Sequence, residues 1–233
     1  MGRRLLLFDL DGTLLDAAGA GRAALHRAAA ELFGDALDFR DVVTAGRLDH
    51  EIFEEAADRA GWTDYDERHH RLRQHYPGVL ADELDRRRDR VRALPGVLTL
   101  LDRLEEVARD AAAGPVVGCL TGNQRAGAGV KLEAVGIDPR RFRVGAYGDE
   151  GRTRPDLVSL AMRRCREATG EAIEGAGVVV VGDTPHDVSC AHAHGAFALA
   201  VTTGRYGRAE LEAAGADRVA DSLEDPGVVL ELL

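Results

Sequence analysis

The stretch that decides the fold is Leu5-Leu6-Leu7-Phe8-Asp9-Leu10-Asp11-Gly12-Thr13, near the start of the chain. Its first half is a short apolar run, which is typical of a strand buried on both faces of a parallel sheet. Its second half contains two acidic residues and includes Asp11-Gly12, a common turn sequence. The stretch therefore predicts a buried strand followed by a turn that carries two carboxylates.

Similar apolar runs recur along the chain, separated by segments with helical spacing. The further runs cover residues 116–120, 178–181 and 197–201. Between them, apolar residues repeat at helical spacing in 98–107, and 155–168 begins with proline, which favours the first turn of a helix. Strands that alternate with helices are typical of a doubly wound parallel sheet. We therefore predict an α/β, Rossmann-like core.

The long segment after the first strand interrupts this alternation. It offers no strand pattern, and its helical segments span 22–33, 50–60 and 66–92. Ligands of open α/β sheets bind beyond the carboxyl ends of the strands, so an insertion that leaves this end of the first strand should overhang the site. We predict an all-helical cap domain at 17–92 and a core domain formed by 1–16 and 93–233.

Composition narrows the class of protein and its partners. The 233 residues carry a net charge of -10, which repels phosphate backbones, so we expect no nucleic-acid partner. No apolar run approaches the roughly 20 residues of a membrane span, and the first run is too short for a secretory signal. Three cysteines without a CxxC pair suit reduced thiols. We expect a cytoplasmic protein, monomeric or homodimeric, without a membrane partner.

Polar residues gather where the strand-like runs end. They are Asp9 and Asp11, then Thr121, Gly122 and Asn123, then Asp183 and Asp187. Because parallel strands end at one edge of the sheet, these side chains should face one crevice. Two carboxylates ~4 Å apart repel by about 4 kcal/mol at an effective dielectric near ~20, so the cluster needs a cation. An all-oxygen donor set suits Mg²⁺, which would also neutralise a bound phosphate.

These residues resemble the four motifs of the haloacid dehalogenase-like (HAD) hydrolases, in order and over nearly the whole chain. The matching stretches are Asp9-Leu10-Asp11-Gly12-Thr13, Thr121-Gly122-Asn123, Arg154-Pro155 and Gly182-Asp183-Thr184-x-x-Asp187. The helical insertion is similar to the C1 cap of subfamily I, in the phosphoglycolate-phosphatase-like branch. The resemblance implies Mg²⁺-dependent hydrolysis of a small phosphorylated metabolite through an aspartyl-phosphate intermediate.

The resemblance also implies roles for single residues. Asp9 would be the nucleophile, and Asp11 would protonate the leaving alcohol and then activate water. Thr121 and Arg154 complete the implied catalytic set. The implied phosphate-binding residues are Gly12, Thr13, Thr121, Gly122, Asn123 and Arg154, and the implied metal-site residues are Asp9, Asp11, Asp183 and Asp187.

Two cap residues are weaker candidates for contact with the phosphorylated substrate. Arg47 follows Gly46 in a segment that resembles a substrate-contacting loop of this branch, and Arg22 lies near the expected hinge. In a chain with so many arginines, each of the two can equally be a solvated surface charge.

The third motif commonly carries lysine in this family, and here we assign the position to Arg154. Arginine keeps the charge and adds bidentate geometry. The other candidate is Lys131, the only lysine of the chain, which lies in the middle of an expected helix. We interpret Lys131 as a surface charge whose removal should matter little.

Some residues also distinguish between the reactions that members of the family catalyse. Asp11 favours a phosphatase over a dehalogenase, because a halide leaves without a proton. A cap without lysine argues against phosphonate hydrolases, which use a cap lysine as a Schiff base. Two alternatives stay open, a phosphomutase of the β-phosphoglucomutase type and a non-catalytic phosphate-binding or phosphoacceptor protein. Phosphoglycolate, sugar phosphates, nucleotides and pyrophosphate all stay open as substrates.

Overall fold

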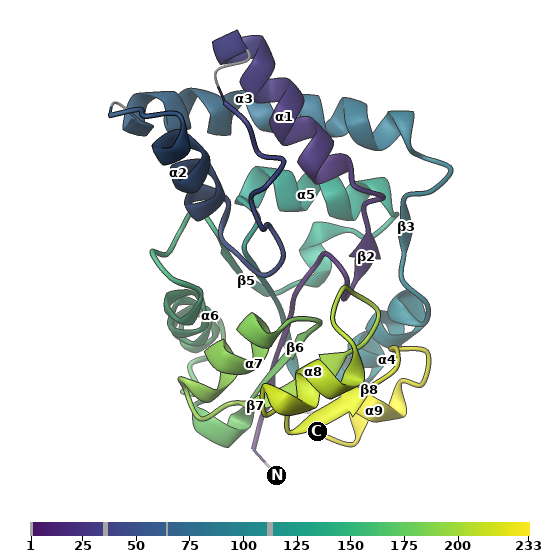
Figure 1. The fold of residues 1–233 in the computed structure, drawn as a ribbon. Helices are drawn as coiled ribbons and strands as arrows, with labels where there is room; N and C mark the ends of the chain where they lie inside the picture. Colours follow the sequence, from purple (N-terminus) through teal and green to yellow (C-terminus); the bar gives the residue numbers. More distant parts are fainter. Residues whose placement is uncertain (1, 35–36, 64, 111–113) are drawn as a thin grey trace.

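The computed structural model describes residues 2–34, 37–63, 65–110 and 114–233. A six-stranded sheet forms one half of the molecule, and a group of helices forms the other (Figure 1). The sheet contains β1 (Leu5–Phe8), β4 (Val116–Thr121), β5 (Val144–Tyr147), β6 (Val178–Gly182), β7 (Phe197–Val201) and β8 (Arg218–Ala220). Its spatial order is β5-β4-β1-β6-β7-β8, and every neighbouring pair is parallel. The predicted doubly wound α/β core is confirmed.

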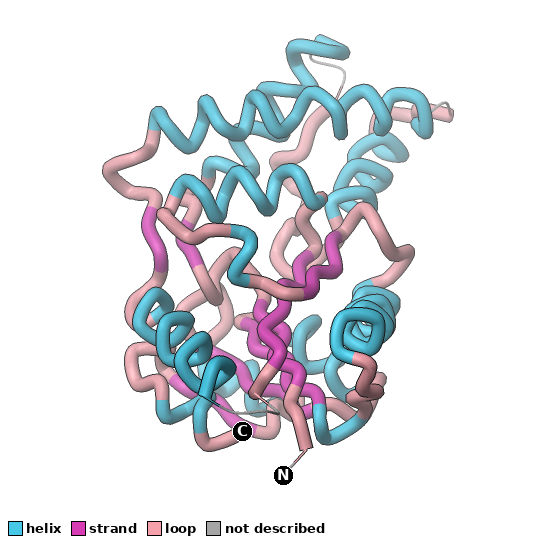
Figure 2. Tube along the Cα trace, turned by 180° about the vertical axis from the view of Figure 1, so that it is seen from behind, coloured by secondary structure: helices cyan, strands magenta, loops and turns pink. Residues whose placement is uncertain are grey.

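Helices cover both faces of this sheet, as the view from behind also shows (Figure 2). They are α4 (Val97–Asp110), α5 (Arg125–Ala134), α6 (Arg154–Thr169), α7 (Pro185–His192), α8 (Arg208–Ala213) and α9 (Gly227–Leu230). Alternate side chains of β1 enter two cores, because successive residues of a strand point to opposite faces. Leu6 and Phe8 pack with α4 and α5, whereas Leu5 and Leu7 pack with α6 and α7. Burying each such leucine contributes roughly 1.5 to 3 kcal/mol.

The other half of the molecule contains α1 (Ala20–Phe33), α2 (Asp49–Arg59) and α3 (Tyr65–Arg86). Every regular element that the structure describes between residues 17 and 91 is a helix, as predicted. The third helix ends at Arg86 and not at residue 92, because the chain turns there and enters a short strand. Residues 35–36 and 64 of the predicted cap lie outside the described residues. None of the described helices is long and apolar enough to cross a membrane.

A two-stranded ribbon lies where the chain leaves the sheet half and returns to it. Strand β2 (Leu15–Asp16) pairs antiparallel with β3 (Arg92–Ala93), and an exposed ion pair joins Arg92 to Asp16 at 3.0 Å. The predicted borders of the insertion, after residue 16 and before residue 93, fall inside this ribbon. The division into two domains stays a prediction.

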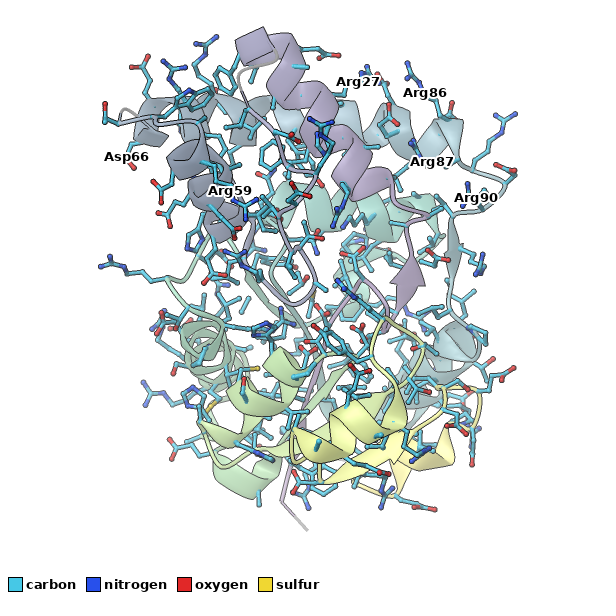
Figure 3. The ribbon with its side chains drawn as sticks, in the orientation of Figure 1. Arg27, Arg59, Asp66, Arg86, Arg87 and Arg90 are labelled. Carbon is cyan, nitrogen blue, oxygen red and sulfur yellow. The ribbon has the colours of Figure 1, made fainter. Side chains whose placement is uncertain are left out.

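An ion-pair cluster holds α1 against α3. Glu83 on α3 is buried and accepts hydrogen bonds from Arg27 on α1, from Arg86 on its own helix and from Arg87 directly after that helix. The three arginines extend from α1 and from the C-terminal end of α3 (Figure 3). Because one buried carboxylate has three cationic partners, its charge is compensated, and the burial lowers stability far less than that of a lone charge would.

Gly96, directly before α4, is at a position that only glycine can occupy. Its φ of 80° is left-handed, and a Cβ there would lie 2.1 Å from the Leu223 carbonyl oxygen. We expect Gly96→Ala to lower the free energy of unfolding by at least ~2 kcal/mol, because both clashing groups are backbone. Denaturant titration measures the change.

Gly129→Ala in α5 is the matched control for that substitution. A Cβ at Gly129 would meet nothing within 4 Å, so alanine should raise the free energy of unfolding by roughly 0.5 to 1 kcal/mol. Equal effects of the two substitutions would contradict the assigned close contact at Gly96.

Candidate active site

Three carboxylates come together at the carboxyl ends of β1 and β6. Asp9 follows β1, Asp183 follows β6, and Asp187 lies in the first turn of α7. All three residues are buried, and each offers an oxygen within 4.8 Å of the others. Within the described ranges, this is the one group of acidic, histidine or cysteine side chains so arranged. The strand-end placement that the sequence predicts therefore produces a compact acidic cluster.

Local sequence fixes the side chain of Asp187. Thr184 is the N-cap of α7, and the two residues form a capping box: Asp187 N–H donates to Thr184, and Asp187 Oδ2 accepts from the Thr184 N–H at 3.0 Å and hydroxyl at 2.7 Å. A Cβ at Gly182 would lie 2.1 Å from the Asp187 carboxyl carbon. These contacts occupy Oδ2 and leave Oδ1 for a second partner.

Asp183 is enclosed by glycines and a threonine. A Cβ would lie 1.7 Å from an Asp183 carboxylate oxygen at Gly204 and 2.5 Å from one at Gly12, so neither position has room for a side chain. The Thr13 hydroxyl donates to Asp183 Oδ1 at 3.4 Å. Thr13 is 1% exposed and is not among the residues that line the cavity, and its role in phosphate binding stays a prediction. Gly204 was not among the residues predicted from the sequence.

Arg154 lies between two of the three carboxylates. Its side chain is 7% exposed, Nη2 lies 3.3 Å from Asp9 Oδ1, and the same nitrogen donates to Asp187 Oδ1. Thr153 caps α6 and Pro155 follows at its start, so Arg154 is held in the first turn of a well-defined helix. Nη1 donates to the Gly46 carbonyl at 3.2 Å. Arg154 therefore links the acidic cluster to the helical half.

The electrostatics of the cluster show that one guanidinium does not balance it. Burial raises the pKa of Asp9 to about 7, although Arg154 opposes the rise. Burial and the neighbouring Asp9 raise the pKa of Asp183 to about 8. Burial alone would lower the pKa of Arg154, but Asp187 and Asp9 outweigh it and raise that pKa. Three buried carboxylates with oxygen donors only fit a hard divalent cation, which would supply the missing positive charge.

Lys131 is not a surface charge, and the interpretation made from the sequence is wrong. Its side chain is 5% exposed, and Nζ lies 2.6 Å from both Asp11 Oδ2 and Asn123 Oδ1. The physical reason is that α5 packs against the sheet on one side and α3 on the other, so its middle residues face inward. The buried residues of α5 include Ala128 and Leu132, three before and one after Lys131. Placement on that apolar face was a signal in the sequence.

Asn123 joins the second motif to the first. Its side-chain amide donates to Asp11 Oδ2 at 2.8 Å and to Thr121 Oγ1 at 2.8 Å. Its backbone N–H also donates to Thr121 Oγ1, at 3.3 Å. Among the described residues, the site thus has two buried cations, Arg154 at the Asp9–Asp187 side and Lys131 at the Asp11 side.

Residues 46–49 of the helical half contact the second motif, Thr121-Gly122-Asn123. Asp49 N–H donates to the Gly122 carbonyl at 3.0 Å, and its carboxylate accepts from the Gln124 N–H at 2.8 Å. Burial raises the pKa of this carboxyl to about 6. A Cβ at Gly122 would lie 2.0 Å from the Arg47 carbonyl oxygen, so glycine is required for this approach. Gly122 was predicted from the sequence, but Asp49 was not. The sequence feature that could have indicated Asp49 is its place at the start of a helix.

A cavity of about 500 Å³ lies between the sheet edge and the helices. The predicted site residues that line it are Asp9, Asp11, Gly12, Arg22, Arg47, Thr121, Gly122, Asn123, Arg154 and Asp183. Arg47 is paired with Glu55, so its charge is already compensated. Arg22 is exposed and donates to backbone carbonyls at 3.3 and 3.4 Å. The helical half adds His50, Phe53 and Tyr76 to the lining.

A parallel α/β sheet with buried carboxylates at its strand ends and a helical half beside the cavity is the arrangement of a hydrolase with a Rossmann-like core. The chain belongs to the haloacid dehalogenase-like hydrolases, whose family model matches residues 4–195. The resemblance drawn from the four motifs is thereby confirmed. A comparison with curated proteins gives no match.

Solved structures share the fold over nearly the whole chain. A hydrolase from Pseudomonas syringae is 24% identical, with a TM-score of 0.67 and coverage of 98% of each chain. A predicted phosphatase from Clostridium acetobutylicum is 18% identical, with a TM-score of 0.69, covering 99% of this chain and 100% of that one. A predicted phosphoglycolate phosphatase from Haemophilus somnus is 17% identical, with a TM-score of 0.64 and coverage of 99% and 97%.

Gly122→Ala tests the contact between residues 46–49 and the second motif. We expect the added Cβ to displace the Arg47 backbone and break both Asp49 hydrogen bonds, so exchange of the two donor amides, Asp49 and Gln124, should rise by roughly 10-fold or more, a loss of about 1.4 kcal/mol or more of protection. Hydrogen–deuterium exchange with mass spectrometry measures this. Gly129→Ala is the control and should leave the exchange unchanged. Wild-type protection in Gly122→Ala would show that the contact does not require glycine.

Proposed function

We propose that this protein hydrolyses a small-molecule phosphate monoester with Mg²⁺, through an aspartyl-phosphate formed on Asp9. The observation that carries the proposal is the pairing of two carboxylates with different surroundings at one cavity. Asp9 is buried among charges beside Arg154, as suits a nucleophile and phosphate site. The Asp11 side chain is 41% exposed and fixed by Lys131 and Asn123, as suits a group that exchanges protons with a leaving alcohol and with water.

The proposed reaction has two steps. An Asp9 carboxylate oxygen attacks phosphorus, and the bond from phosphorus to the ester oxygen breaks while Asp11 gives that oxygen its proton. Asp11 then takes a proton from water, whose oxygen attacks the aspartyl-phosphate and releases phosphate and free Asp9. Thr121 and the backbone at Asn123 would hold the phosphoryl oxygens, and Arg154 would offset the charge on them.

The metal has defined candidate ligands in this proposal. The ligands of Mg²⁺ would be Asp9, Asp183 and the Asp11 backbone carbonyl. Asp187 would orient a water bound to the ion, and it would also orient the Arg154 side chain. When bound, the ion supplies positive charge that neutralises the carboxylate cluster and the phosphate. The family and the acidic cluster support a divalent cation, and the all-oxygen donor set favours Mg²⁺.

The helical insertion has a defined role in the proposal. We propose that residues 17–92 form a cap that closes the cavity over the substrate and excludes water. The cavity of about 500 Å³ leaves room for a leaving group as large as a sugar or a nucleoside beyond the phosphate position. The phosphoglycolate-phosphatase name of the Haemophilus somnus structure supports the same reaction class.

Asp9→Asn tests the nucleophile. The amide is nearly isosteric but cannot form the acyl-phosphate, so we expect turnover of p-nitrophenyl phosphate to fall by at least ~1000-fold while the unfolding midpoint stays near the wild-type value. Asp102→Asn, an exposed residue of α4 outside the cavity lining, is the control and should keep full turnover. A wild-type kcat in Asp9→Asn with Mg²⁺ present would reject the assignment. Turnover that needs a bisphosphorylated sugar would indicate a phosphomutase.

Metal removal gives a second test. Excess EDTA should abolish turnover, and Mg²⁺ should restore it, because the carboxylate cluster repels a phosphate without added positive charge. Ca²⁺ should bind but not support turnover, since its larger and looser oxygen shell does not hold the reacting groups in line. Steady-state assays across the three conditions measure this. Full activity in excess chelator is the result that rules out a metal requirement.

A further inference from the structure

Lys131 is a buried charge that contacts Asp11 but takes part in no step of the proposed mechanism described so far. It is the only lysine of the chain, and its side chain is 5% exposed. Arg154 already serves Asp9 and Asp187, which lie on the other side of the site. Burying an ammonium is unfavourable unless its partners compensate it, so Lys131 should have a function at the groups that it contacts.

Lys131 and Asn123 both donate hydrogen bonds to the same oxygen of Asp11. Nζ lies 2.6 Å from Asp11 Oδ2, and the Asn123 amide donates to the same Oδ2 at 2.8 Å. Nζ also lies 2.6 Å from Asn123 Oδ1, so the three side chains form a closed triangle. Among the described residues, Asp11 Oδ1 has no hydrogen-bond partner. The triangle therefore fixes the carboxyl plane through Oδ2 and leaves Oδ1 for chemistry.

The helical half encloses this triangle. A Cβ at Gly21, at the start of α1, would lie 3.3 Å from Lys131 Nζ and 3.5 Å from the Tyr76 hydroxyl of α3. The Lys131 side chain thus lies where α1, α3 and α5 meet; it is 5% exposed and lines the cavity together with Asp11 and Asn123. Charge-assisted hydrogen bonds are strong at a site with little water, so the triangle holds Asp11 firmly at the cavity wall.

We propose that Lys131 is a positioning residue for the proton transfers of Asp11. It directs Asp11 Oδ1 at the leaving oxygen, so that Oδ1 gives its proton to the alcohol and later receives one from water. Arg154 and Lys131 thus have separate tasks, the first at the phosphoryl charge and the second at the proton donor. This assignment rests on the proposed phosphatase function.

Lys131→Met removes the charge at similar side-chain length. In kcat/KM, which reports steps up to the first transfer to Asp9, we expect a loss of roughly 100-fold for phenyl phosphate, whose leaving group needs a proton. The loss for p-nitrophenyl phosphate should be under ~10-fold. Asp11→Asn should show the same split, and the double variant should be no slower than Asp11→Asn alone, because both substitutions remove one function.

Two measurements separate positioning of Asp11 from phosphate binding. Competitive inhibition by inorganic phosphate should stay within ~3-fold of wild type in Lys131→Met, since Arg154 and Thr121 hold the anion. Arg125→Met removes a charge from the same helix, where Arg125 pairs with Glu150 outside the cavity lining, and should leave kcat/KM unchanged for both esters. Weakened phosphate inhibition together with equal losses for both esters would overturn the proposal.

Folding is monitored by thermal unfolding of each variant. If Lys131→Met does not fold, Lys131→Gln keeps a donor for Asp11 Oδ2 and should show the same leaving-group split with a smaller loss for phenyl phosphate. Equal losses for both esters in Lys131→Gln would overturn the proposal as well. Failure of the phosphatase proposal gives a different result, in which the wild type hydrolyses neither ester or Asp9→Asn keeps full activity.

Discussion

Repulsion among buried carboxylates is the constraint on which the rest of this site depends. Asp9 is brought to the sheet edge by β1, and Asp183 and Asp187 by the connection from β6 into α7, and all three residues are buried there. Arg154 offsets part of the charge, and the raised pKa values of Asp9 and Asp183 show that burial and mutual repulsion exceed this compensation. The cluster is therefore suited to ligands of opposite sign, a divalent cation first and then the phosphate that the cation attracts.

Backbone proximity is the second constraint, and it connects the helical half to the chemistry. Gly122 lies close to the backbone on two sides. A Cβ at Gly122 would clash with the Arg47 carbonyl oxygen, and a Cβ at Gly148 would lie 1.8 Å from the Gly122 carbonyl oxygen. Gly46 accepts from Arg154, and Asp49 binds the backbone of the second motif. Residues 46–49 thus contact both the second motif and Arg154, the cation of the acidic cluster. Movement of these residues would change both at once.

The two buried cations divide the site into two chemical regions. Arg154 lies among the carboxylates of the acidic cluster, whereas Lys131 lies in a triangle with Asp11 and Asn123. Asn123 connects the regions because it also donates to Thr121. In the proposed reaction, negative charge at the nucleophile and protonation of the leaving group would therefore be controlled by different residues.

The sequence by itself determined the core fold and the motif residues, because both depend on local patterns. A strand buried on two faces needs a continuous apolar run, which identified β1, β4, β6 and β7. Strands β5 and β8 were not predicted. The sequence of β5, Val-Gly-Ala-Tyr, is not a continuous apolar run, and β8 has only three residues, at the edge of the sheet. Only the tertiary structure decided that Lys131 and Asp49 reach the site. Lys131 is buried because α3 and the sheet enclose α5, although its place on the apolar face of that helix was a signal in the sequence. Asp49 meets Gln124 although 75 residues separate them, a contact that packing creates and local patterns do not encode.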